Sequence, residues 1–97
     1  MLNPHKRCQE TRRLLNEGAR LVDVRTENEY RQGALQDAIN HPVEWISAGH
    51  HPQEEKETPL VVYCVSGARS SAAKNMLLAA GFKNVHDLGS YQNIQFC

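Results

Sequence analysis

Residues 64–70, with the sequence Cys-Val-Ser-Gly-Ala-Arg-Ser, bring a thiol, a glycine and a guanidinium together in one short segment. An apolar run at 60–63 precedes this segment, and a helical pattern at 71–80 follows it. A cysteine between a buried strand and a helix N-terminus faces backbone N–H dipoles that favour the thiolate. The segment therefore predicts a nucleophile, Cys64, beside an anion-binding loop that includes Arg69.

The other residue types in this loop are compatible with a thiolate site. Gly67 permits a backbone conformation in which N–H groups converge on the sulfur, and Ala68 is too small to block a pocket. Ser66 and Ser70 can donate hydroxyl hydrogen bonds. Lowering a thiol pKa from ~8.5 to roughly 6.5 requires about 2.7 kcal/mol. A helix N-terminus supplies at most ~2 kcal/mol, so the loop N–H groups and Arg69 must supply the rest.

Strand and helix patterns alternate along the whole chain. The predicted helical segments are 4–17, 27–32, one or two turns at 43–48, 71–80 and a short helix within 89–96. The predicted strands are 21–24, 38–40, 60–63 and 85–88. This alternation predicts an α/β fold, with a small parallel sheet of four to five strands flanked by helices on both faces, in a single domain over residues 1–97. Ligands bind beyond the carboxyl ends of such strands, where Cys64 lies.

Composition and charge exclude several partners. Eleven basic and eleven acidic residues give no net charge, which argues against a nucleic-acid partner. No apolar stretch approaches the length of a membrane span, and residues 1–7 do not resemble a signal peptide, so we expect a cytoplasmic protein. His50 and His51 have no third ligand at metal spacing, and we expect no metal site.

The three cysteines predict free thiols. Their number is odd and no CxxC pair occurs, which is typical of a reducing compartment. Cys8 falls on one face of the first predicted helix and is interpreted as a small apolar residue. Cys97 is the last residue of the sequence and is expected to be exposed, where it could form intermolecular disulfides in vitro.

Several segments resemble, in order, the motifs of the rhodanese family. Residues 21–30, LVDVRTENEY, resemble L-I-D-V-R-x-x-x-E-[FY], and residues 61–70 resemble [IV]-V-x-Y-C-x-x-G-x-R-S. Residues 33–40 and 80–85 resemble two further motifs, and the match covers roughly residues 10–93. The resemblance implies a cofactor-free sulfurtransferase that moves sulfane sulfur from a donor such as thiosulfate to cyanide, a thiol or a protein, through a persulfide. A monomer is expected.

The resemblance also assigns roles to individual residues. Cys64 matches the catalytic cysteine, and Arg69 matches the loop arginine near the substrate oxyanion. The backbone N–H groups of residues 65–70 match the persulfide cradle, which adds Val65 to the substrate-binding residues. Independently of the resemblance, three charged residues near the predicted strand end are interpreted as structural: Asp23, Arg25 and Glu29.

The sequence departs from the family pattern at three positions. Ala34 stands where a histidine is usual, and Asp37 where a glycine is usual. We expect these two changes to affect structure rather than chemistry. Val65 replaces the arginine that often follows the cysteine, so the loop holds one arginine instead of two. This predicts a weakly charged pocket that handles doubly charged thiosulfate less efficiently.

Two other functions remain open from the sequence. A cysteine phosphatase needs an arginine six positions after its cysteine, whereas Arg69 is at the fifth position. The loop is therefore one residue short for a phosphate ring. A rhodanese-like docking or regulatory module without activity is the second alternative, although inactive members commonly lack the cysteine that is present here as Cys64.

Overall fold

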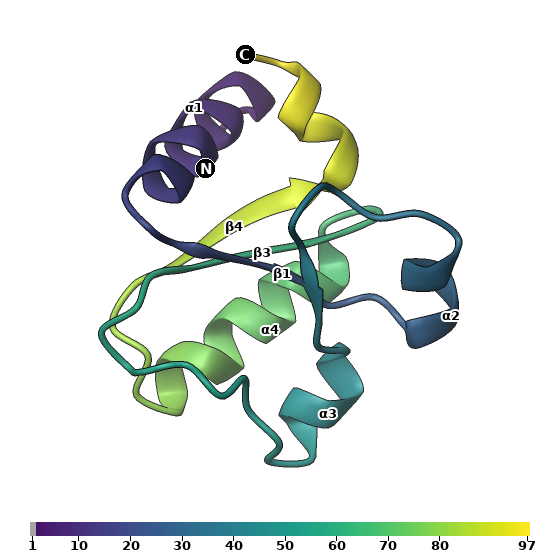
Figure 1. The fold of residues 1–97 in the computed structure, drawn as a ribbon, viewed down its shortest axis with the longest axis vertical. Coiled ribbons are helices and arrows are strands. Elements are labelled where there is room, and N and C mark those ends of the chain that lie inside the picture. Colours follow the sequence, from purple (N-terminus) through teal and green to yellow (C-terminus); the bar gives the residue numbers. More distant parts are fainter. Residues whose placement is uncertain (1) are drawn as a thin grey trace.

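The computed structural model describes residues 2–97 and contains one parallel sheet (Figure 1). Its strands are β1 (Arg20–Asp23), β2 (Ile39–Asn40), β3 (Leu60–Cys64) and β4 (Val85–Ser90). They are arranged in the order β2-β1-β3-β4, so β3 is paired on both sides. Every residue of β3 is buried, as its unbroken apolar sequence predicts. The predicted α/β class and parallel sheet are confirmed.

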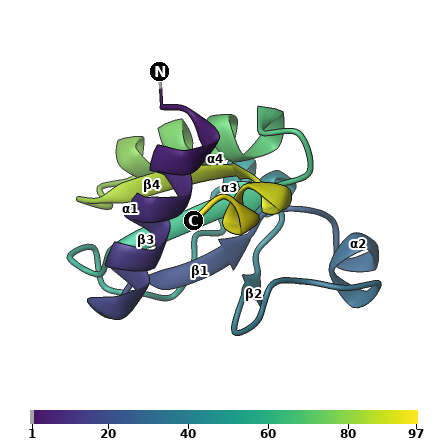
Figure 2. The ribbon, with the colours of Figure 1, turned by 90° about the horizontal axis from the view of Figure 1, so that it is seen from above.

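Helices cover both faces of this sheet (Figure 2). Helix α1 (Pro4–Asn16) and the 3-10 helix η1 (Tyr91–Gln95) lie on one face. Helices α3 (Val43–Ser47) and α4 (Ala68–Ala79) lie on the other face, and α2 (Glu27–Arg31) stands beyond the end of β1. Each face has its own apolar core, the first around Leu14, Val61 and Leu88, the second around Val62, Leu77 and Phe82.

Local capping signals explain where the helices begin. The Asn3 side chain accepts a hydrogen bond from Lys6 N, and Thr26 forms a capping box with Glu29. Helix α4 begins at Ala68, three residues before the predicted start at 71, because Gly67 already acts as its cap with φ +99°. The earlier start places the backbone of the Cys64 loop in the first turn of α4.

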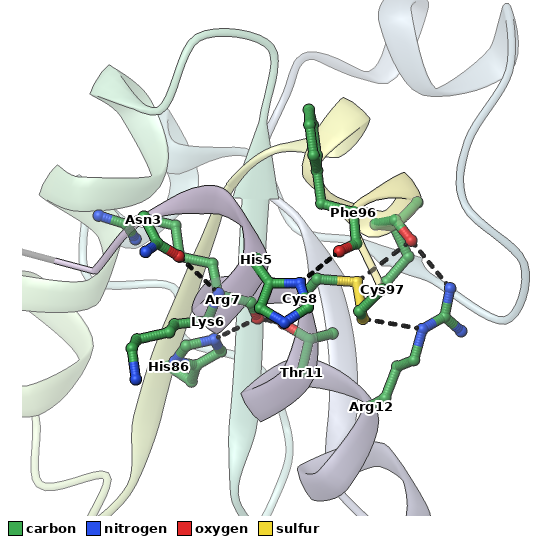
Figure 3. Close-up of a disulfide and its surroundings, with 11 residues drawn as sticks. Asn3, His5, Lys6, Arg7, Cys8, Thr11, Arg12, His86, Phe96 and Cys97 are labelled. Atoms are coloured by element: carbon green, nitrogen blue, oxygen red, sulfur yellow. Dashed lines mark hydrogen bonds between the residues drawn. A yellow bond between two sulfur atoms is a disulfide. The ribbon is translucent and has the colours of Figure 1, made fainter.

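The prediction of free thiols at Cys8 and Cys97 is wrong. The two cysteines form a disulfide with a Cα–Cα distance of 5.8 Å, across a sequence separation of 89 (Figure 3). The sheet topology explains the pairing, because it places α1 and η1 side by side on one face. Arg12 reinforces the contact by donating from Nη2 to the Ile94 carbonyl oxygen at 2.8 Å. Within residues 2–97, Cys64 is the one free cysteine.

Two negative findings concern the described residues. No helix within residues 2–97 is both long and apolar enough to span a membrane. Over the same range, no three His, Cys, Asp or Glu side chains are grouped so that they could hold a metal ion.

Candidate active site

The Cys64 sulfur lies at the carboxyl end of β3 and receives hydrogen bonds from the first turn of α4. Gly67 N–H donates to Sγ at 3.0 Å, and Ser70 N–H donates to it at 3.4 Å. In the thiol state, Sγ donates to Ser70 Oγ at 3.5 Å, while that hydroxyl donates to the Gly67 carbonyl. Two backbone donors and one hydroxyl therefore surround a sulfur whose residue has no exposed surface.

These contacts shift the ionisation of the thiol. Burial alone raises the pKa of Cys64, since the charged form is disfavoured away from water. The Ser70 hydroxyl and the backbone N–H groups of Ser70, Gly67 and Arg69 act in the opposite direction and together outweigh burial. The pKa of Cys64 is consequently lowered, which is the condition a nucleophilic cysteine needs.

The outer side of the loop is open to solvent. Val65 is 42% exposed, and Ser66 and Ala68 are exposed as well. Val65 also lines a cleft of about 530 Å³. The other lining residues come from the segment after β1 and from η1: Arg25, Glu29, Gln32, Gly33, Ala34, Leu35 and Tyr91. A substrate in this cleft would lie against the exposed side of the loop that holds the buried sulfur.

Asp23 and Arg25 form a buried salt bridge beneath the cleft. Arg25 Nη2 lies 2.7 Å from Asp23 Oδ2, and Arg25 Nε also donates to the same carboxylate. Arg25 Nη2 donates to the Gly33 carbonyl at 2.7 Å as well. The pair therefore joins the end of β1 to the wall of the cleft, and the structural role of both residues stays a prediction.

Two tyrosines that the sequence analysis did not single out complete this cluster. The Tyr63 hydroxyl donates to Asp23 Oδ2 at 2.8 Å and accepts from Leu35 N–H at 3.1 Å. The Arg25 guanidinium carbon lies 5.7 Å from the ring centroid of Tyr63 and 5.6 Å from that of Tyr91. A tyrosine within a buried aliphatic strand needs a partner for its hydroxyl, and this signal could have identified Tyr63.

Arg69 and Glu29 form the second ion pair of the site. Arg69 Nη1 donates to Glu29 Oε1 at 2.6 Å, and Nη2 donates to Oε2 at 3.0 Å. Glu29 also accepts from Thr26 N–H. These bonds, Arg69 first, lower the pKa of Glu29 to about 2. The loop arginine is thus held by a carboxylate on α2, a contact that the sequence analysis did not predict.

Two of the three family departures lie in the loop between α2 and β2. Asp37 adopts a left-handed backbone with φ +66°, which explains why glycine suits this position and why aspartate is tolerated. Ala34 lines the cleft. Val65 lines the same cleft, so this departure concerns the cleft as well as the fold.

Comparisons with known proteins identify the family. The Rhodanese-like domain family matches residues 8–96. The human single-domain sulfurtransferase TSTD1 has a similar structure, with a TM-score of 0.75 and 28% identity over 88% of each chain. The chain belongs to the rhodanese-like domain family, which confirms the family resemblance.

Two of the curated relatives are named as thiosulfate sulfurtransferases. A putative mitochondrial thiosulfate sulfurtransferase of Schizosaccharomyces pombe is 35% identical over 77 residues, covering 67% of this chain and 54% of that protein. Thiosulfate sulfurtransferase 18 of Arabidopsis thaliana is 33% identical over 93 residues, covering 78% of this chain and 65% of that protein. The chain thus spans between half and two thirds of the length of these relatives.

Proposed function

We propose that the chain is a sulfurtransferase in which Cys64 carries sulfane sulfur as a persulfide. The observation that carries the proposal is the Cys64 sulfur itself, which accepts N–H bonds from Gly67 and Ser70 at the carboxyl end of β3. Family membership supports the same activity. The named relatives suggest thiosulfate as one donor.

The reaction divides into two balanced displacements. In the first, the Cys64 thiolate attacks the outer sulfur of thiosulfate, the S–S bond to the sulfonate breaks, and sulfite leaves with the bonding electron pair. The product is Cys64–S–S⁻. In the second, an acceptor such as cyanide or a thiolate attacks the outer sulfur of the persulfide and regenerates the Cys64 thiolate. No oxidant is required in either displacement.

The loop has a separate role in each state of the sulfur. Its N–H donors stabilise the thiolate before transfer, and the N–H groups of residues 65–70 would bind the terminal sulfur of the persulfide. Arg69 belongs to the same loop, and its guanidinium is paired with Glu29. Because Cys64 has no exposed surface, the loop around it must move before a donor can reach Sγ.

Intact-mass spectrometry after thiosulfate treatment tests the proposal. We expect the wild-type protein to gain the mass of one sulfur atom, to lose it when cyanide is added, and to release thiocyanate. The Cys64→Ser variant should gain nothing. A folded wild-type protein without an adduct would instead support the docking-module alternative. Turnover of an aryl phosphate that depends on Cys64 would support the phosphatase alternative.

The proposal also covers the sulfur acceptor and the cellular location of the protein. Cyanide and small thiols fit the open cleft, and a protein thiol could reach Val65 from solvent, since that side chain is 42% exposed. We propose a monomer. A cytoplasmic location stays a prediction, because one relative is named as mitochondrial.

A further inference from the structure

The charges around the cleft are balanced in pairs. Arg25 and Glu29 both line the cleft. Arg25 is neutralised by the buried carboxylate of Asp23, and Glu29 is paired with Arg69. Arg69 itself is not among the lining residues. A dianionic substrate entering the cleft therefore meets no unpaired cation, because Arg25 is held by Asp23 and Arg69 is held by Glu29.

Arg69 in particular is not a free cation. Both of its Nη atoms donate to Glu29, and the carboxylate of Glu29 is ionised at neutral pH because its pKa is about 2. The negative charges of Glu29, the Cys64 thiolate and Glu44 all raise the pKa of Arg69, Glu29 most strongly. The surroundings of this guanidinium are thus acidic overall. An anionic donor would have to compete with Glu29 for it.

We propose that Glu29 determines specificity at this site, by disfavouring dianionic sulfur donors relative to donors of lower charge. The inference rests on the proposed function and concerns the same cleft. A second negative charge on the donor doubles its repulsion from Glu29, whereas the geometry of attack on its sulfane sulfur is unchanged. Val65 acts in the same direction, because it adds no positive charge to the loop.

Two donors with the same sulfonyl chemistry separate charge from reactivity. Thiosulfate is a dianion, and methanethiosulfonate is a monoanion that loses methanesulfinate in the same displacement. We choose Glu29→Gln as the variant because glutamine still accepts from Thr26 N–H at the third helical position, so the capping box is kept. The variant removes the charge and leaves the helix start intact.

Steady-state kinetics should show a change that depends on donor charge. We expect Glu29→Gln to raise kcat/KM for thiosulfate roughly tenfold and for methanethiosulfonate roughly threefold, because the electrostatic contribution scales with donor charge. The increase should shrink as salt is added. A direct readout is thiosulfate binding to Cys64→Ser, which should tighten when Glu29→Gln is added.

Glu27→Gln is the matched control. It removes the same charge from an exposed position on the same helix, so kcat/KM for each donor should change by less than twofold. Equal changes for the two donors, a loss of thiosulfate activity in Glu29→Gln, or an equal effect of Glu27→Gln would each overturn the inference. If neither donor charges Cys64 in any variant, the proposed function fails and this inference fails with it.

Discussion

Two arginine–carboxylate pairs lie near the carboxyl edge of the sheet, and they differ in burial. The side chains of Asp23 and Arg25 are 0% and 10% exposed, whereas those of Glu29 and Arg69 are 32% and 34% exposed. Both pairs have at least two hydrogen bonds between carboxylate and guanidinium. The two pairs therefore have similar numbers of hydrogen bonds, but solvent screens the charges of the Glu29–Arg69 pair more than those of the Asp23–Arg25 pair.

This difference in burial predicts different roles for the two pairs: the Asp23–Arg25 pair stabilises the fold, and the Glu29–Arg69 pair affects substrate preference. A buried charge that loses its partner is costly, so the Asp23–Arg25 pair must stay intact for the fold to persist. A pair that is about one third exposed contributes little to stability, and its carboxylate, Glu29, lines the cleft, where its charge acts on a ligand. We therefore expect substitutions in the first pair to unfold the protein and substitutions in the second pair to change its substrate preference.

The largest expected effect is that of Asp23→Asn. The variant leaves the Arg25 guanidinium buried without its counter-charge and weakens the Tyr63 hydroxyl bond. We expect a loss of about 3–5 kcal/mol in the free energy of unfolding, measured with urea. Glu29→Gln, measured in parallel, should cost less than about 1 kcal/mol. Equal losses in the two variants would remove the distinction between the pairs.

Tyr63→Phe should have the next largest effect. Removing the hydroxyl leaves the Leu35 N–H without its acceptor and takes one donor from Asp23 Oδ2, which keeps its bonds from Arg25, and this should cost about 1–3 kcal/mol. Tyr30→Phe is a matched control, because the Tyr30 hydroxyl makes one bond, to the Ala38 carbonyl, at a half-buried position. Thermal and urea unfolding should rank Tyr63→Phe as more destabilising, and the reverse order would contradict the role given to Tyr63.

Ser70→Ala should change ionisation at the active site. The Ser70 hydroxyl is the strongest of the groups that lower the pKa of Cys64. Without it, the pKa should rise, and the rate of persulfide formation at neutral pH should fall. The pH dependence of thiolate absorbance, with Cys64→Ser as the blank, measures the shift. An unchanged or lower pKa in Ser70→Ala would remove the hydroxyl from the cradle.

The smallest expected effect is the loss of the Glu29–Arg69 pair's contribution to stability at low pH. The pKa of Glu29 in the folded protein, about 2, lies below its ordinary value of 4.5. Its contribution is therefore fully present above the ordinary pKa and is lost as the pH falls toward 2. Solvent screening keeps this contribution below about 1 kcal/mol. The stability difference between wild type and Glu29→Gln should fade over this pH range, and a difference that grew with acid would contradict the assignment.

The sequence predicted those parts of the site that are local in the chain. The Cys64 loop, the Asp23 and Arg25 positions and the sheet around them follow from contiguous motifs and from apolar patterning. The Arg69–Glu29 contact joins residues 40 positions apart, and it depends on where the fold places Glu29 of α2 relative to the first turn of α4. A local sequence pattern does not show which residues 40 positions apart come into contact.

The disulfide was missed for a related reason. Cysteine number and the absence of a CxxC pair indicated free thiols, but neither observation reports on residues 89 positions apart. Their pairing depends on α1 and η1 sharing one face of the sheet, which becomes visible only in three dimensions. Tyr91 was missed for the same reason, because its contact with Arg25 joins η1 to the segment after β1.

The Cys8–Cys97 bond turns residues 8–97 into a covalent ring that contains all four strands and the active-site loop. A single cleavage in the segment 50–58, which holds neither helix nor strand, would open the ring without releasing a fragment. The two pieces would separate only after reduction. A nicked, oxidised molecule would consequently keep β1 and β3 tethered, with Cys64 and the cleft residues on the same covalent assembly.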